Sequence, residues 1–193
     1  MKYPPIKNNL FTNNRKNFVS RIKSNAIAIF HSNDEFPKNG DQTFPFKQNA
    51  DFFYLTGIDQ EQSVLILYLD CPNPSYKEVL FLRQTNEHIA VWEGHKYTKE
   101  EARKASGIEN VQWLDEYDAI LHTIINYATH IYINTNENDR YSHSVPYRDV
   151  RMFEQLRQKY PLHQYERSAV ILRDLRAVKS EAEVELTQKA CAI

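Results

Sequence analysis

The sequence predicts a layered α/β domain built around a mixed central sheet. Short apolar segments alternate along the chain with amphipathic segments that have helical spacing, which is the pattern of strands covered by helices. Two consecutive apolar segments, residues 63–70 and 78–83, are separated by the turn sequence CPNP, which is typical of a hairpin. An antiparallel hairpin beside strands joined by helices makes the sheet mixed rather than all parallel.

The first half of the chain supplies the expected hairpin and the helix that precedes it. Phe18 and Ile22 lie four residues apart, as on one face of a helix. The residues after them include Pro37, Gly40 and Pro45 among polar side chains, which indicates a loop. The expected elements are a helix over residues 12–23, a strand over 25–30, a loop over 31–45, and strands over 63–70 and 78–83.

The second half alternates between helices and short strands. Gly107 follows a helical segment as a C-terminal cap, and Asp115 can cap the N-terminus of the next helix. The expected elements are a helix over residues 98–106, a strand over 111–114, a helix with apolar residues from Tyr117 to Ala128, a strand over 130–134, a loop over 135–144, a helix over 147–159 and a last strand within 162–166.

The final segment predicts a helix that leads out of the domain. Ser180 and Glu183 form a capping box, because each side chain can bond the backbone N–H of the other. The helix has Ala182, Leu186, Ala190 and Ile193 on one face, and the sequence stops there without a capping signal. We therefore divide the chain into a domain over residues 1–175 and a linker helix over 176–193, and expect a further domain after it.

Composition excludes several classes of protein. The chain has 193 residues, of which 41% are hydrophobic and 25% charged, so it can fold around a substantial core. A net charge of −1 without a basic stripe argues against nucleic acid as a partner. Cys71 and Cys191 make no disulfide framework, no signal peptide is evident, and the longest apolar run, residues 64–69, is too short to span a membrane. We expect a cytoplasmic protein without a membrane partner.

No catalytic or metal-binding motif is complete within the sequence. The seven histidines lack the spacing of a zinc motif, the acidic residues are scattered, and no nucleophile elbow or glycine-rich phosphate loop occurs. We therefore assign no catalytic and no metal-ligating residue to this chain. Any active site must be completed elsewhere.

Two unusual segments remain, and the first is FPFKQNADFFYLTG, residues 44–57. We expect its aromatic residues to pack in the core, while its amides satisfy backbone groups that lack sheet partners. Asp51 can cap a short helical turn over residues 52–55. The aromatic residues are Phe46, Phe52, Phe53 and Tyr54, and the polar residues expected to fix the backbone are Gln48, Asn49 and Asp51.

The second unusual segment is HIAVWEG, residues 88–94. Trp92 stands directly before Glu93 and Gly94, which is typical of a tryptophan at a surface or at the rim of a pocket. A partly buried tryptophan in the core fits the same pattern, and the residues alone leave both interpretations open.

Three blocks together resemble a known family. FPFKQNADFFYLTGIDQEQSVLIL resembles the signature of the N-terminal domain of aminopeptidase P, the Xaa-Pro aminopeptidases. VWEG, residues 91–94, is similar to the Trp-x-Gly segment of that family, and LRAVKSEAEVELTQKACAI is similar to its linker helix. The blocks stand in the family's order and span nearly the whole chain.

The resemblance implies a ribonuclease-H-like three-layer fold, followed by a catalytic domain of the pita-bread fold. In the family that second domain holds two metal ions, usually manganese, on two Asp, one His and two Glu side chains, which here would lie beyond Ile193. The implied reaction removes the N-terminal residue from peptides with proline in second position. This chain alone is then expected to be inactive, and the whole protein to form dimers or tetramers.

The resemblance also implies two substrate-binding residues. Trp92 corresponds to a tryptophan that projects toward the active site of a neighbouring subunit, and Asp41 to an acidic residue that faces the cleft. Glu93 departs from the family, where an aromatic or apolar residue is common. A prolidase or creatinase relative, or a peptide- or protein-binding module that has lost its metal ligands, shares this architecture and stays open as an alternative.

Overall fold

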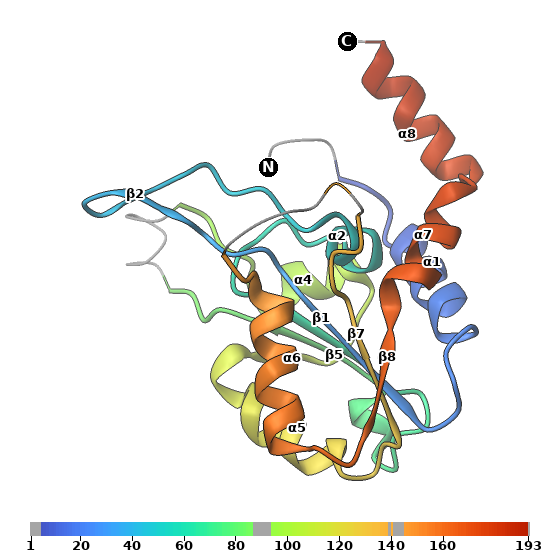
Figure 1. The fold of residues 1–193 in the computed structure, drawn as a ribbon. Coiled ribbons are helices and arrows are strands. Elements are labelled where there is room, and N and C mark those ends of the chain that lie inside the picture. The colour runs from blue at the N-terminus through green and yellow to red at the C-terminus, as the bar shows by residue number, and fades with distance from the viewer. Residues whose placement is uncertain (1–4, 87–93, 139, 141–144, 193) are drawn as a thin grey trace.

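The structure is a computed structural model, and it describes residues 5–86, 94–138, 140 and 145–192. A six-stranded sheet lies between two layers of helices (Figure 1). The predicted three-layer α/β fold with a mixed sheet is confirmed.

The sheet has the strand order β6-β5-β4-β1-β7-β8. The predicted hairpin is formed by β4 and β5, which pair antiparallel, and β1 also pairs antiparallel with β4. The pairs β1–β7, β7–β8 and β5–β6 are parallel. The strands are β1 Ala26–His31, β4 Val64–Leu67, β5 Glu78–Leu82, β6 Val111–Trp113, β7 His130–Ile133 and β8 Gln164–Arg167.

Alternate residues of the central strands enter two separate cores. Ile27 and Ile29 of β1 face the layer formed by α5 and α6, whereas Ala28 and Phe30 face the opposite layer. Every residue of β1 and β4 is buried, which explains why their sequences are continuously apolar rather than alternating.

The two helical layers are unequal. One consists of α5 Tyr117–Ile125 and α6 Arg148–Lys159, and the other contains α1 Asn9–Val19, α2 Ala50–Thr56, α4 Lys99–Ser106 and α7 Ser168–Ala177. Two short 3-10 helices, η1 Pro74–Tyr76 and η2 Leu114–Glu116, follow β4 and β6 in the chain. No helix in the described ranges is long and apolar enough to cross a membrane.

Two expectations about local structure are wrong. The segment over residues 31–45 is not simply a loop, because β2 Pro37–Asn39 and β3 Gln42–Thr43 form a small exposed hairpin that projects from the body of the domain (Figure 1). Asp115 does not cap α5, because it lies inside η2, which takes the place of the capping turn.

Helix α8, Glu181–Cys191, begins at the predicted capping box. Ser180 Oγ accepts from the Glu183 N–H, and the Glu183 carboxylate accepts from the Ser180 N–H. None of its residues is buried, and Figure 1 shows it extending away from the three layers. The helix therefore contributes little to the core of this domain.

Candidate functional site

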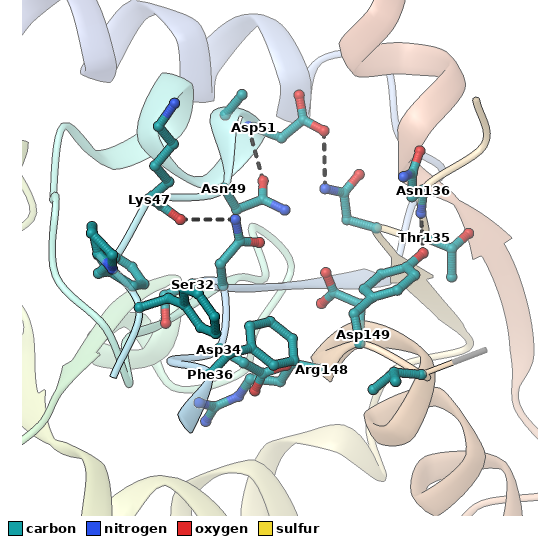
Figure 2. A pocket seen from close by; sticks show the side chains of 18 residues that line it. Ser32, Asp34, Phe36, Lys47, Asn49, Asp51, Thr135, Asn136, Arg148 and Asp149 are labelled. Atoms are coloured by element: carbon teal, nitrogen blue, oxygen red, sulfur yellow. Dashed lines mark hydrogen bonds between the residues drawn. The ribbon is translucent and has the colours of Figure 1, made fainter. Parts of the chain in front are cut away.

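A cavity of about 590 Å³ opens at the carboxyl ends of β1 and β7 (Figure 2). These strands are parallel neighbours, so the chain leaves both at the same edge of the sheet, the usual place for ligands in α/β proteins. Ser32 and Asn134 follow the two strands directly and line the cavity. Its volume is in the range of pockets that hold small organic ligands or short peptide segments.

A buried histidine–carboxylate pair adjoins this cavity, and the carboxylate member, Asp149, lines it. His31 Nδ1 and Asp149 Oδ1 are 2.6 Å apart, and both residues are only 2% exposed. Asp149 lies in the first turn of α6, where a carboxylate interacts favourably with the helix dipole. The pair fixes the start of α6 against the end of β1, while His31 Nε2 has no hydrogen-bond partner among the described residues.

A second polar group joins the cavity to the last helices. Asp51 accepts from Asn134 Nδ2 through Oδ2 at 3.1 Å and from Arg176 Nη1 through Oδ1 at 2.5 Å. Asn134 is 5% exposed, and its Oδ1 has no hydrogen-bond partner in the described part of the chain. Since a buried acceptor is normally satisfied, Asn134 leaves a place for a donor from a ligand or from water.

The mouth of the cavity is apolar. Phe36, Phe44 and Val145 are each about half exposed and line it. The two phenylalanines are held together because the Phe44 N–H donates to the Phe36 carbonyl at the base of the β2–β3 hairpin. An apolar mouth over a polar floor suits binding of a molecule with both kinds of surface.

The Arg148 guanidinium stands on the α6 side of the cavity, whereas Lys47 lies on the same side as Asn49 (Figure 2). Burial lowers the pKa of the Arg148 guanidinium, and the nearby Asp34 carboxylate opposes that shift. Asp34 itself makes a two-pronged ion pair with Arg151, at 2.7 and 3.2 Å. The three carboxylates that line the cavity, those of Asp34, Asp51 and Asp149, therefore each have a partner within the domain.

The segment over residues 44–57 builds one wall of the cavity through its amides. Gln48 Nε2 donates to the carbonyls of Ile58 and Gln60, while its Oε1 accepts from the N–H groups of Asn33 and Asn49. Gln48 thereby satisfies backbone groups in two loops, as expected. Asn49 Oδ1 accepts from the N–H groups of Asp51 and Phe52 and caps α2.

Two expectations for this segment need correction. Asn49 caps the helix, and the carboxylate of Asp51 instead binds Asn134 and Arg176. Of the four aromatic residues only Phe52 is buried in the core, at 1% exposure. Tyr54 packs at the edge of that core, Phe53 lies edge-on to Phe11, and Phe46 lines the cavity.

A second cavity, of about 810 Å³, lies between the N-terminal helices and the last two helices. Tyr54 and Phe53 line it together with Leu186 of α8. The Arg176 guanidinium lies 6.0 Å from the ring centre of Tyr54. Asp51 borders both cavities, so the ion pair with Arg176 connects the edge of the sheet to the predicted linker.

The predicted site residues do not gather in the first cavity. Asp41 is exposed at the turn of the β2–β3 hairpin, beyond the phenylalanines at its base, and does not line the cavity. Trp92 lies outside the described residues. Within the described ranges no group of three or more His, Cys, Asp or Glu side chains could hold a metal ion.

Few features of the sequence point to the residues that the structure brings together. His31 and Asp149 are 118 residues apart, and each lies inside an ordinary strand or helix. The one available signal is a histidine directly at the end of an otherwise apolar strand, where a polar side chain needs a partner.

Comparison with known proteins identifies a family over most of the chain. The model of the family "Aminopeptidase P, N-terminal domain" matches residues 11–132. The Xaa-Pro aminopeptidase of Haemophilus influenzae is 23% identical over 180 residues, which are 93% of this chain and 39% of that protein. The chain thus spans about two fifths of the length of this curated relative.

Solved structures share the fold. A putative aminopeptidase P from Bacillus anthracis superposes with a TM-score of 0.82 at 24% identity, over 93% of this chain and 42% of that one. Aminopeptidase PepP from Pseudomonas aeruginosa has a TM-score of 0.77 at 23% identity, over 94% of this chain and 41% of that one. At these identities the likeness establishes the fold alone.

Proposed function

Because the chain belongs to the aminopeptidase P N-terminal domain family, we propose that it is the N-terminal domain of a metal-dependent Xaa-Pro aminopeptidase. The observation that carries the proposal is the family match over residues 11–132, which includes the cavity-forming segment over residues 44–57. Relatives that bear the name Xaa-Pro aminopeptidase match nearly the full length of this chain and extend well beyond it.

In this proposal the reaction takes place in a second domain that the linker helix joins to residues 1–175. Two manganese or other divalent ions would be held there and would supply an activated water and a polarised scissile carbonyl. The exposure of α8 supports a role as a connection to another part of the protein. The ion pair between Asp51 and Arg176 would fix the direction in which this connection leaves the domain.

The contribution of this domain would be to shape the substrate pocket and to assemble subunits. A bond that precedes proline is a tertiary amide without an N–H, so a pocket for it must recognise the ring instead. A flat aromatic contact from Trp92 would meet this need, and Asp41 would add a carboxylate near the cleft. The β2–β3 hairpin, with Asp41 at its turn, projects from the body of the domain, which supports a role in contact with another subunit.

The proposal is tested with the natural full-length protein. It is incubated with an Xaa-Pro-Xaa peptide and an Xaa-Ala-Xaa control, with and without manganese, and release of the free N-terminal residue is followed. We expect manganese-dependent release from the proline peptide only. Release from neither peptide would favour the binding module, and cleavage restricted to Xaa-Pro dipeptides would favour the prolidase relative.

The role of Trp92 is tested in the same assay. Trp92→Ala should lower kcat/KM for the proline peptide by about 10- to 100-fold, because a misplaced substrate loses that much rate. Tyr127→Ala is the matched control, since Tyr127 is 61% exposed and precedes β7, at the edge of the sheet opposite the cavity. Equal kcat/KM in the two variants would mean that Trp92 does not contribute to the substrate pocket.

A further inference from the structure

Two asparagine side chains that line the first cavity each use only one end of the amide within the domain. Asn49 Oδ1 accepts from the backbone N–H groups of Asp51 and Phe52, so its Nδ2 is the end that remains. Asn134 Nδ2 donates to Asp51 Oδ2, so its Oδ1 is the end that remains. These partners fix the orientation of both amides, because a backbone N–H only donates and an ionised carboxylate only accepts.

Asp51 holds the two amides at one place. Its backbone N–H bonds Asn49 and its carboxylate bonds Asn134, and Figure 2 draws both bonds as dashed lines. The cavity is therefore lined by a donor from the start of α2 and by an acceptor from the residue after β7. The acceptor is the stronger signal for a ligand. Asn134 is 5% exposed, its Oδ1 has no partner among the described residues, and a buried acceptor without a donor is destabilising.

An extended peptide supplies the complementary pair of groups. In an extended chain the N–H and the C=O of one residue point to the same side, as they do in paired antiparallel strands. The N–H of such a residue can donate to Asn134 Oδ1 while its C=O accepts from Asn49 Nδ2. Both contacts are made to the backbone, so they require no particular side chain and no free N-terminus.

The apolar mouth of the cavity supplies a place for one side chain of the peptide. Phe36, Phe44 and Val145 are about half exposed there. Successive side chains of an extended peptide point to opposite faces, so one of them can contact this surface while the backbone bonds the amides. The three carboxylates that line the cavity disfavour an anionic ligand such as a nucleotide. The lining therefore suits a neutral peptide with an apolar side chain.

We propose that the first cavity is a peptide-binding site, which holds an internal stretch of an extended peptide by its backbone and by one apolar side chain. The inference goes beyond the proposed hydrolysis, because these contacts need neither proline nor a free N-terminus, and it does not rest on that function. It accounts for the remaining ends of both amides and for the exposed phenylalanines at the mouth.

The first test is the binding of a blocked peptide, acetyl-Ala-Leu-Ala-amide, to the full-length protein by isothermal titration calorimetry. An acetylated peptide without proline is not a substrate of the proposed hydrolysis, so binding and hydrolysis are measured independently. Asn49→Asp keeps the oxygen that caps α2, because Asp and Asn are equally good caps, and replaces the Nδ2 donor by an oxygen. We expect this variant to raise the Kd at least about tenfold.

Asn73→Asp is the matched control for Asn49→Asp. Asn73 caps η1 in the same way, since its Oδ1 accepts from the Ser75 N–H, but it is exposed and does not line the cavity. The same change of amide to carboxylate should therefore leave the Kd of the peptide at its parent value.

The second test concerns the side chain at the mouth. Phe44→Ala should raise the Kd of acetyl-Ala-Leu-Ala-amide about three- to tenfold and leave that of acetyl-Ala-Ala-Ala-amide nearly unchanged, because only the leucine reaches the ring. Phe44 is 54% exposed, so its removal does not open the core. Tyr127→Ala, which removes an exposed aromatic ring at the opposite edge of the sheet, should affect neither peptide.

Three results would overturn the inference. The blocked peptide does not bind the parent protein at millimolar concentration; or it binds and neither Asn49→Asp nor Phe44→Ala weakens it, which places it elsewhere; or uridine, a neutral ligand with a donor and an acceptor on one edge, binds instead and is weakened by Asn49→Asp. None of these results changes the outcome of the Xaa-Pro-Xaa hydrolysis assay, so failure of this inference and failure of the proposed function are distinguishable.

Discussion

Replacement of Asp51 by asparagine tests whether the ion pair to Arg176 holds the linker in place. The carboxylate binds two donors, Arg176 Nη1 at 2.5 Å and Asn134 Nδ2 at 3.1 Å. An amide at this position can still accept from Arg176, but it turns its own N–H₂ group toward that of Asn134. The change therefore removes the negative charge that attracts Arg176, and it places two N–H₂ donor groups against each other.

The expected change in the free energy of unfolding depends on how exposed the two side chains of the ion pair are. A hydrogen bond to a charged group contributes about 1.5–3 kcal/mol when buried, whereas exposed ion pairs contribute about 0–1 kcal/mol. The side chains of Asp51 and Arg176 are 23% and 41% exposed, so solvent screens part of the interaction. We expect Asp51→Asn to lower the free energy of unfolding by about 1–2 kcal/mol, which lowers the Tm by about 2–8 °C for a domain of this size.

The assay is urea and thermal unfolding followed by circular dichroism, with Asp174→Asn as the control. Asp174 lies on α7, the helix that also carries Arg176, and its side chain is 59% exposed beside Arg173. The control should change the free energy of unfolding by less than about 0.5 kcal/mol. Equal stability of the two variants would refute the reasoning, because the Asp51 carboxylate would then contribute no more than a surface charge.

Two further predictions concern buried polar groups. Arg15 is fully buried and donates to the carbonyls of Leu55 and Ser106, so Arg15→Leu should cost about 3–5 kcal/mol in urea unfolding; a cost below about 1 kcal/mol would contradict this. Burial raises the pKa of Tyr68 from 10.0 to about 12. The folded state therefore holds the phenolic proton up to a higher pH than the unfolded state does. The contribution of the protonated Tyr68 to stability is complete below pH 10 and is lost as the pH rises toward 12. Between pH 10 and pH 12 the free energy of unfolding of Tyr68→Phe should fall by about 2–3 kcal/mol less than that of the parent protein. The same pH dependence in both proteins would contradict the raised pKa of Tyr68.

The sheet could be predicted from the sequence because its strands are apolar and its turns are marked. Buried strands such as β4 have no competing pattern, and the connection between β4 and β5 contains two prolines, Pro72 and Pro74. Gly107 and the capping box at Ser180 also fix helix ends through local interactions that the sequence displays directly. Elements held by local chemistry were therefore found at nearly the right residues.

The candidate site could not be predicted in the same way, because its contacts join distant parts of the chain. The sequence predicts Asp51 as the cap of α2, but the helix begins at Ala50, and Asn49, two residues before Asp51, takes that role. The Asp51 carboxylate is then free to bind Arg176, 125 residues away. The sequence does not predict the β2–β3 hairpin, because its five strand residues are all exposed and carry no alternation of apolar and polar side chains.

We propose that this domain contributes to a peptidase site without containing one. The most direct measurement compares residues 1–193 with the natural full-length protein on the same Xaa-Pro-Xaa peptide, with manganese present in both. We predict release of the N-terminal residue by the full-length protein and none above the blank by the 193-residue chain. Manganese-dependent release by residues 1–193 alone would contradict the account.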